Sequence, residues 1–203
     1  MKHIILTILI ICIGISKSES QEKMTDANNN AIMIQLKNAY QKQDYNTFWN
    51  IFPNNFQQFI YYYGFENYEK GNLSLYEESY KHIMYLFSDN LIKDKEHIEK
   101  LVSIAIDGYW DADASSHYQD GIQDLIIEMP DMFIDILLQY SDAELEKFWS
   151  YILDAPFPFA KDFEVHTGYK KFFQEISEKI CNKSERMNRI VKKAYKKILD
   201  SAE

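Results

Sequence analysis

Large apolar residues return every three or four positions along most of this chain, and no stretch alternates apolar with polar residues over the length of a strand. Tyr118, Ile122 and Leu125 show the pattern, because these positions fall on one face of an α-helix. With only 6 Gly and 4 Pro, the chain also has few of the turn residues that many-stranded sheets need. The pattern predicts an all-α protein, a single domain of about eight or nine short helices arranged as a bundle or an irregular array of helix pairs.

Several polar residues are placed to begin or end these helices. Asp94 is a predicted N-cap, and Ser141 with Glu144 three residues later has the spacing of a capping box. Gly64 is expected to end a helix in the left-handed conformation that glycine adopts readily. Residues 65–72, which lie between two glycines, are expected to form a loop.

The first twenty residues have the pattern of a secretory signal peptide. Lys2 precedes a mostly apolar run over residues 4–15, which is shorter than the roughly 20 residues that span a bilayer. Small residues then alternate up to residue 20, and we expect cleavage after Ser18 or Ser20. The mature protein is therefore expected to be exported, either to the periplasm or as a secreted protein.

Two other interpretations of this segment stay open: an uncleaved membrane anchor, and a lipoprotein modified on Cys12. Ile11 argues against the lipoprotein, because a lipobox has a small residue at that position. After cleavage, the polar residues 21–30 are expected to be flexible, and residues 31–203 to form the helical domain. We expect no stable transmembrane segment in that mature chain.

The net charge of −9 argues against nucleic acid and anionic membranes as partners, and removal of residues 1–20 makes the chain slightly more acidic. A protein partner is therefore expected to be basic. Basic residues concentrate between 183 and 197, but Glu185 and Asp200 flank them, so we interpret them as the solvated face of one helix. Cys181, alone after signal cleavage, falls on an apolar helical face and is expected to be buried.

Residues 111–115 raise the question of a metal site. Their Asp-x-Asp-x-Ser pattern resembles the start of a calcium loop, but such a loop has glycine at its sixth position and glutamate at its twelfth. Those positions hold Ser116 and Ile122, so an EF-hand is excluded.

Two hypotheses remain for this stretch. Asp113, His117 and Asp120 recur at helical spacing, so a carboxylate and an imidazole one turn apart could share a divalent cation. Alternatively, the stretch only begins a helix, with Asp111 or Asp113 accepting from free backbone N–H groups and Trp110 packing over the first turn. We favour the helix start, which explains each residue without a ligand.

Residues 59–68 hold more aromatic side chains than one helical face can bury, and residues 156–159 add a stiff apolar stretch. Either they pack into the core of the domain, as most large apolar residues do, or part of them forms a binding surface for a protein or a sugar. The candidate contact residues are Tyr61, Tyr62, Tyr63, Phe65, Tyr68, Trp110, Phe157 and Phe159. Phe157 and Phe159 belong to a Pro-Phe-Pro-Phe stretch that cannot be helical throughout.

The order of Phe52-Pro53, Tyr63-Gly64, Trp110-Asp111 and Phe148-Trp149 resembles that of small exported helical proteins of bacterial type. In class alone, the chain also resembles immunity proteins that neutralise toxins, which are small, acidic and helical. These resemblances imply an all-α fold and no particular functional residue.

We therefore expect a non-enzymatic protein-binding module, similar to inhibitor or immunity proteins only in class, that needs no cofactor. No phosphate loop, nucleophile elbow or zinc-protease motif is present in the sequence. Two alternatives stay open: a metal-dependent enzyme centred on residues 111–124, and a structural component of the cell envelope.

Overall fold

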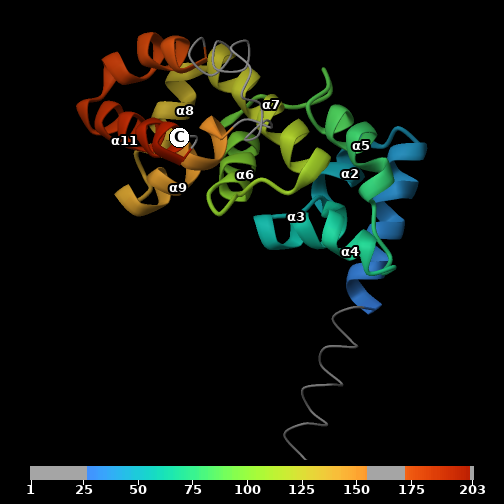
Figure 1. Ribbon diagram of the computed structural model, residues 1–203. Coiled ribbons are helices and arrows are strands. Elements are labelled where there is room, and N and C mark those ends of the chain that lie inside the picture. Colours follow the sequence, from blue (N-terminus) through green and yellow to red (C-terminus); the bar gives the residue numbers. More distant parts are fainter. Residues whose placement is uncertain (1–26, 155–171, 202–203) are drawn as a thin grey trace, which may run out of the picture. The chain divides into compact units, whose positions relative to one another are not determined.

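A computed structural model describes residues 27–154 and 172–201 of the chain. Every regular element in these ranges is a helix, so the predicted all-α class is confirmed (Figure 1). Some of the sequence predictions lie outside these ranges: the signal peptide at residues 1–20, residues 21–26 of the flexible segment, and both Phe157 and Phe159.

The chain divides into two compact units, residues 1–51 and 52–203, and each is described by itself. In the first unit, residues 27–41 form a helix, which therefore already includes residues 27–30 of the segment that was expected to be flexible. Gln43 follows with a left-handed backbone, at a φ of 55°. Asp44 then begins α2 (Tyr45–Ile51), because its carboxylate accepts from the N–H of Thr47 at 3.1 Å.

The second unit holds the remaining helices. They are α3 (Phe56–Tyr63), α4 (Phe65–Glu69), the 3-10 turn η1 (Tyr76–Glu78), α5 (Ser79–Leu86), α6 (Lys95–Ala105), α7 (Ala112–Glu128), α8 (Pro130–Leu137), α9 (Asp142–Leu153), a helix over residues 172–179, the 3-10 turn η2 (Cys181–Lys183) and α11 (Glu185–Ser201). No helix within the described ranges combines the length and the apolar character needed to cross a bilayer.

Two of the predicted helix starts are confirmed in detail. The carboxylate of Asp94 accepts from the N–H of His97 at 3.0 Å, at the start of α6. Ser141 and Glu144 form the reciprocal capping box of α9: the N–H of Glu144 donates to Ser141 Oγ, and the N–H of Ser141 donates to the carboxylate of Glu144.

The predicted loop over residues 65–72 is wrong, because α4 occupies most of it. Gly64 is not left-handed either: at a φ of −72° it ends α3 and directly precedes α4. A Cβ at Gly64 would lie 2.4 Å from the carbonyl oxygen of Ile60 and 2.8 Å from a carboxylate oxygen of Asp111. Glycine is therefore required by close packing at this junction, and not by an unusual backbone angle.

The core of the second unit is aromatic around Tyr63 and Tyr118, which are fully buried. The ring of Phe59 lies between them, 5.5 Å from Tyr63 and 5.1 Å from Tyr118 between centroids. The Tyr118 hydroxyl donates to the carbonyl of Leu101 at 2.8 Å, which satisfies its buried polar group.

His82 of α5 is buried as well. Its Nδ1 lies 3.1 Å from the hydroxyl of Tyr63, within hydrogen-bonding distance. The pKa of Tyr63 is raised well above its usual value by burial, so the hydroxyl stays protonated.

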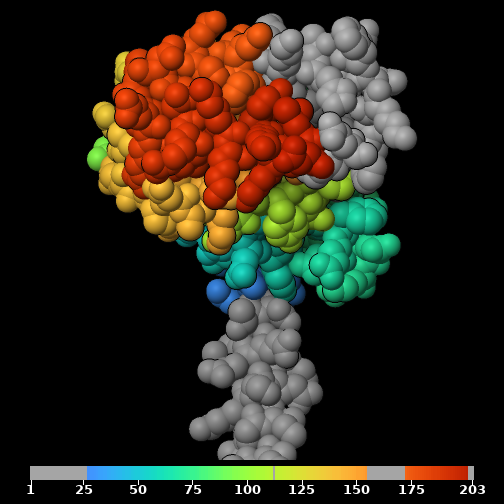
Figure 2. All heavy atoms as spheres, turned by 60° about the vertical axis from the view of Figure 1, so that its left-hand side comes forward, coloured from blue at the N-terminus to red at the C-terminus, as the bar shows by residue number. Residues whose placement is uncertain are grey.

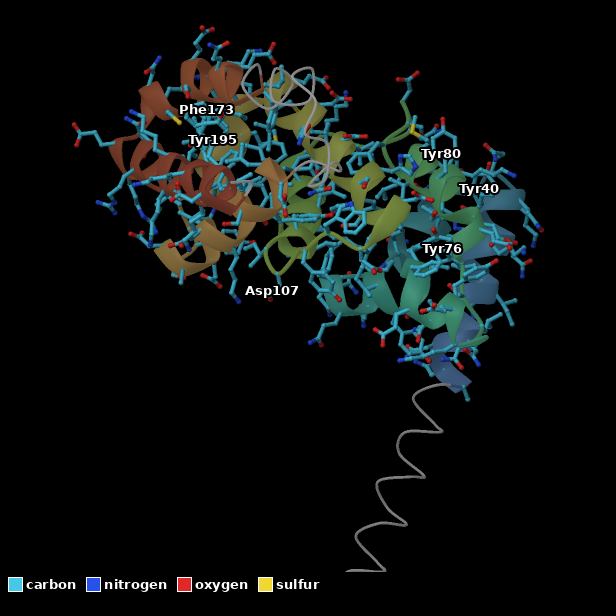
Figure 3. All side chains as sticks on the ribbon, in the orientation of Figure 1. Tyr40, Tyr76, Tyr80, Asp107, Phe173 and Tyr195 are labelled. Carbon is cyan, nitrogen blue, oxygen red and sulfur yellow. The ribbon has the colours of Figure 1, made fainter. Side chains whose placement is uncertain are left out.

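The C-terminal helix α11 packs along α9, and Figure 2 shows it in red across this face of the second unit. Its apolar side, which includes Met187 and Val191, is buried, and Cys181 just before it is buried as predicted. Also on α11, the ring of Tyr195 stacks on Phe173 at 4.0 Å between centroids (Figure 3).

The basic side chains of α11 are less free than the sequence suggested, because several of them pair with acids of α9. The pairs are Arg186 and Arg189 with Asp142, and Lys193 and Lys197 with Glu146. These ion pairs lie near the surface, where each contributes little to stability. They do reduce the positive charge that α11 presents to a partner.

Lys100 of α6 is partly buried, with consequences for stability at high pH. Burial lowers the pKa of its ammonium group from 10.5 to about 8. Folding therefore costs free energy while the ammonium group is charged. This cost is present below the folded pKa and is relieved as the pH rises through that pKa. We predict that the free energy of unfolding increases as the pH rises from about 8 toward the pH at which tyrosines ionise. Urea unfolding at a series of pH values measures this increase.

Replacement of Lys100 by Met should remove this increase, because Met keeps much of the side-chain volume without a charge to bury. The matched control is Lys95→Met, since the side chain of Lys95 is 61% exposed on the same helix. An increase that persists in Lys100→Met would contradict the assignment to Lys100.

Candidate functional site

The segment from Gly108 to Asp111 connects α6 to α7 and is fixed by Tyr151 of α9. A Cβ at Gly108 would lie 2.3 Å from the Tyr151 ring, so only glycine lets the segment pass this closely. The Tyr151 hydroxyl donates to the carbonyl of Ser115 at 3.0 Å, and Ser115 Oγ donates to the carbonyl of Tyr109 at 2.8 Å. These buried contacts determine where Tyr109 and Asp111 lie.

Asp111 or Asp113 was expected to cap α7, and the structure corrects this for Asp111. The side chain of Asp111 makes no capping bond to α7 and instead accepts from the N–H of Phe65, the first residue of α4, at 3.2 Å. Partial burial raises the pKa of the Asp111 carboxyl, and the neighbouring charge of Glu66 raises it further. Asp111 thus connects the start of α7 to the start of α4.

Three aromatic rings meet beside this connection, and we call Phe65, Tyr68 and Tyr76 the aromatic cluster. The centroid of Tyr76 lies 5.4 Å from that of Phe65 and 5.0 Å from that of Tyr68, and Phe65 and Tyr68 are 6.2 Å apart. Phe65 remains 39% exposed and Tyr68 42% exposed. The rings therefore pack on one another and still present apolar surface to solvent.

Carboxylates surround the aromatic cluster. The hydroxyl of Tyr68 donates to Glu77 at 2.9 Å, and the hydroxyl of Tyr76 donates to Asp113 at 3.2 Å. The hydrogen bond to Glu77 raises the pKa of Tyr68, and burial together with Asp113 raises the pKa of Tyr76. Both hydroxyls therefore stay protonated, and the hydrogen bonds hold both rings in place.

Of the other predicted contact residues, Trp110 lies on the surface, whereas two of the three tyrosines of α3 are buried. Trp110 is 39% exposed, and its indole N–H donates to Ser116 Oγ at 3.2 Å, over the first turns of α7 as predicted. Tyr62 and Tyr63 are 2% and 0% exposed, so they belong to the core and cannot contact a partner. Tyr61 is half-buried, with its ring 5.9 Å from that of Tyr62.

Tyr76 was not singled out from the sequence, although it completes the aromatic cluster. It lies in the short turn η1, which directly precedes α5. The one signal in the sequence was its place before Glu77 and Glu78, since an aromatic beside acids is typical of a partly exposed position.

The residues of the metal hypothesis do not converge. Asp113 is exposed and accepts from Tyr76, and the ring of His117 packs against Tyr80 at 4.9 Å between centroids. Asp120 is exposed farther along α7. Within residues 27–154 and 172–201, no group of three or more acidic, histidine or cysteine side chains is placed to hold a metal ion.

Comparisons with known protein families, with curated proteins and with solved structures give no match to this chain. The candidate site therefore depends on the geometry of these residues alone.

Loss of the Asp111 acceptor should destabilise the second unit. Asp111→Ala leaves the N–H of Phe65 without its partner, and we expect it to lower the free energy of unfolding by about 1 kcal/mol. Asp111→Asn keeps an oxygen acceptor and removes a partly buried charge, so we expect little loss at neutral pH.

Urea unfolding of both variants checks this, with Asp124→Ala as the control because Asp124 is exposed on the same helix α7. Equal losses for Asp111→Ala and Asp111→Asn would show that the hydrogen bond to Phe65 is not what Asp111 contributes.

Proposed function

We propose that this chain is a non-enzymatic protein-binding module, and that the aromatic cluster with its surrounding carboxylates is the surface that contacts a basic partner. The observation that carries the proposal is the mutual packing of Phe65, Tyr68 and Tyr76 while two of the three rings keep about two fifths of their surface exposed. Exposed aromatic groups of this kind are typical of the centres of protein interfaces.

The hydrogen bonds of the cluster support a role in binding. Tyr68 and Tyr76 are each held by a carboxylate, so little side-chain freedom remains to be lost when a partner docks. A tyrosine also offers a large apolar area together with a polar edge, which suits a surface that is hydrated until the partner arrives.

The charges around the cluster favour a basic partner. Glu77 and Asp113 bond the hydroxyls of Tyr68 and Tyr76, and Asp111 bonds the backbone of Phe65. Glu66, next to Phe65, pairs with Lys70 at 2.5 Å. Such a surface attracts cationic groups and repels phosphate, in keeping with a chain whose net charge is −9.

Three predictions from the sequence accompany this proposal. The chain would act after export, as a single domain over residues 31–203, in the manner of inhibitor or immunity proteins as a class. The exposed acids and aromatics suit such a role, because they would meet a basic surface on the protein to be held.

The test is to isolate a partner with the tagged chain from its native extract and then to measure affinity by calorimetry. We expect Tyr68→Ala to weaken binding about tenfold or more, as truncation of a central aromatic contact does. Tyr80→Ala is the control, because Tyr80 is 55% exposed on α5 and lies outside the aromatic cluster. A partner that binds Tyr68→Ala as tightly as the wild type would contradict the proposal.

A further inference from the structure

A groove opens along the first part of α3, from Asn55 to Ile60. Its volume is about 580 Å³, and its lining residues are Asn55, Phe56, Gln57, Ile60, Asp107 and Tyr109. Asp107 and Tyr109 come from the segment that precedes α7, so the groove shares its support with the aromatic cluster. Figure 3 labels Asp107 and Tyr76, which mark the two places on the second unit.

The groove offers an aromatic wall. The ring of Phe56 is buried and meets the ring of Tyr109 edge-on, at 4.9 Å between centroids. Tyr109 itself is 56% exposed, which is a large fraction for an aromatic side chain fixed by buried neighbours. A cation beside such a ring is attracted by the negative charge of the ring face.

The charge in the groove comes from Asp107, and no basic residue lines it. At present the carboxylate of Asp107 pairs with Lys147 of α9 at 2.6 Å, with both side chains more than three fifths exposed. The chain thus places one of its own cations on this carboxylate. Because an exposed ion pair contributes little free energy, a cation from a partner can replace Lys147 without a large cost.

We infer that this groove receives an arginine side chain of the basic partner, an inference that rests on the proposed function. Arginine fits better than lysine, because its planar guanidinium group stacks on an aromatic ring and bonds a carboxylate with two parallel N–H groups. Tyr109 supplies the ring and Asp107 the carboxylate. The amide side chain of Gln57 supplies a further acceptor, whereas that of Asn55 already accepts from the N–H of Gln58.

The distance between the groove and the aromatic cluster determines how far apart the two contacts of the partner lie. From Phe56 at the far end of the groove, the eight residues of α3 extend about 12 Å along the helix axis toward Phe65, and Ile60 brings the near end of the groove to about half that distance. In an extended segment of a partner, side chains about two to four residues apart on the same face cover this range. One of them would be the arginine in the groove, and the other would contact the aromatic cluster.

The test uses a short probe that fills only the groove: the peptide acetyl-Gly-Gly-Arg-Gly-Gly-amide, titrated into the full chain and followed by NMR. We expect saturable shifts at the backbone amides of Gln57, Ile60 and Tyr109. The same peptide with citrulline, which keeps the shape of arginine without its charge, should cause none. Shifts that avoid these residues, or equal shifts with citrulline, would overturn the inference.

Two variants of the Asp107–Lys147 ion pair are expected to change the affinity for the arginine peptide in opposite directions. Asp107→Asn should weaken the arginine peptide about fivefold or more, because the carboxylate is lost. Lys147→Met should tighten binding by about twofold to threefold, because the competing cation is gone. Asp135→Asn is the control, since Asp135 is an exposed acid on α8, outside the groove. An affinity that both pair variants leave unchanged would also overturn the inference.

The two proposals fail in different ways. If Tyr68→Ala keeps full affinity for the isolated partner, the proposed function fails. If Tyr68→Ala loses the partner while Asp107→Asn changes neither peptide nor partner binding, the proposed function stands and the inference about the groove fails. Both variants replace exposed side chains, so the folded state is retained for the comparison.

Discussion

The packing of Tyr151 against Gly108 is the contact on which the candidate surface depends. Tyr151 is buried, and its ring lies so close to Gly108 that a Cβ there would be 2.3 Å from it. Its hydroxyl bonds to Ser115 at the start of α7, and its ring meets Phe56 of α3 at 5.4 Å between centroids. One side chain of α9 therefore determines how α3, α7 and the segment between α6 and α7 meet.

Both proposed contact places follow from this arrangement. Tyr109, which forms a wall of the groove, follows Gly108 directly, and its carbonyl accepts from the Ser115 hydroxyl. Two residues later, Asp111 accepts from the N–H of Phe65 and so places the first ring of the aromatic cluster. Because the contacts of Tyr151 with Gly108 and Ser115 are buried, the segment that carries Tyr109 and Asp111 is held in place before any partner binds.

The sequence was sufficient where the deciding contacts are local. Asp94, and Ser141 with Glu144, cap their helices through residues three positions away, so a short pattern contains all the information. The inner face of α7 was predicted for the same reason, since Tyr118 and Ile122 follow the helical period and are both buried.

The sequence was not sufficient where a contact between residues far apart in the chain determines the structure. The backbone N–H that Asp111 accepts lies 46 positions away in sequence, so no local pattern could replace the predicted cap of α7 by a bond to Phe65. The aromatic residues around Gly64 also differ in their burial, which no local pattern indicates. Tyr62 and Tyr63 are buried, and Phe65, at the start of α4, is exposed. His82 is buried because the Tyr63 hydroxyl provides a hydrogen-bonding partner inside the core.

Hydrogen exchange at the Phe65 amide in the Gly108→Ala variant tests this dependence most directly. The variant places a methyl group against Tyr151, and the account predicts faster exchange at Phe65, because Asp111 moves with the displaced segment. Gly121→Ala is the matched control, since its Cβ would lie 2.4 Å from Phe87, and exchange at Phe65 should keep its wild-type rate. An unchanged rate at Phe65 in Gly108→Ala would contradict the claim that Tyr151 and Gly108 position the candidate surface.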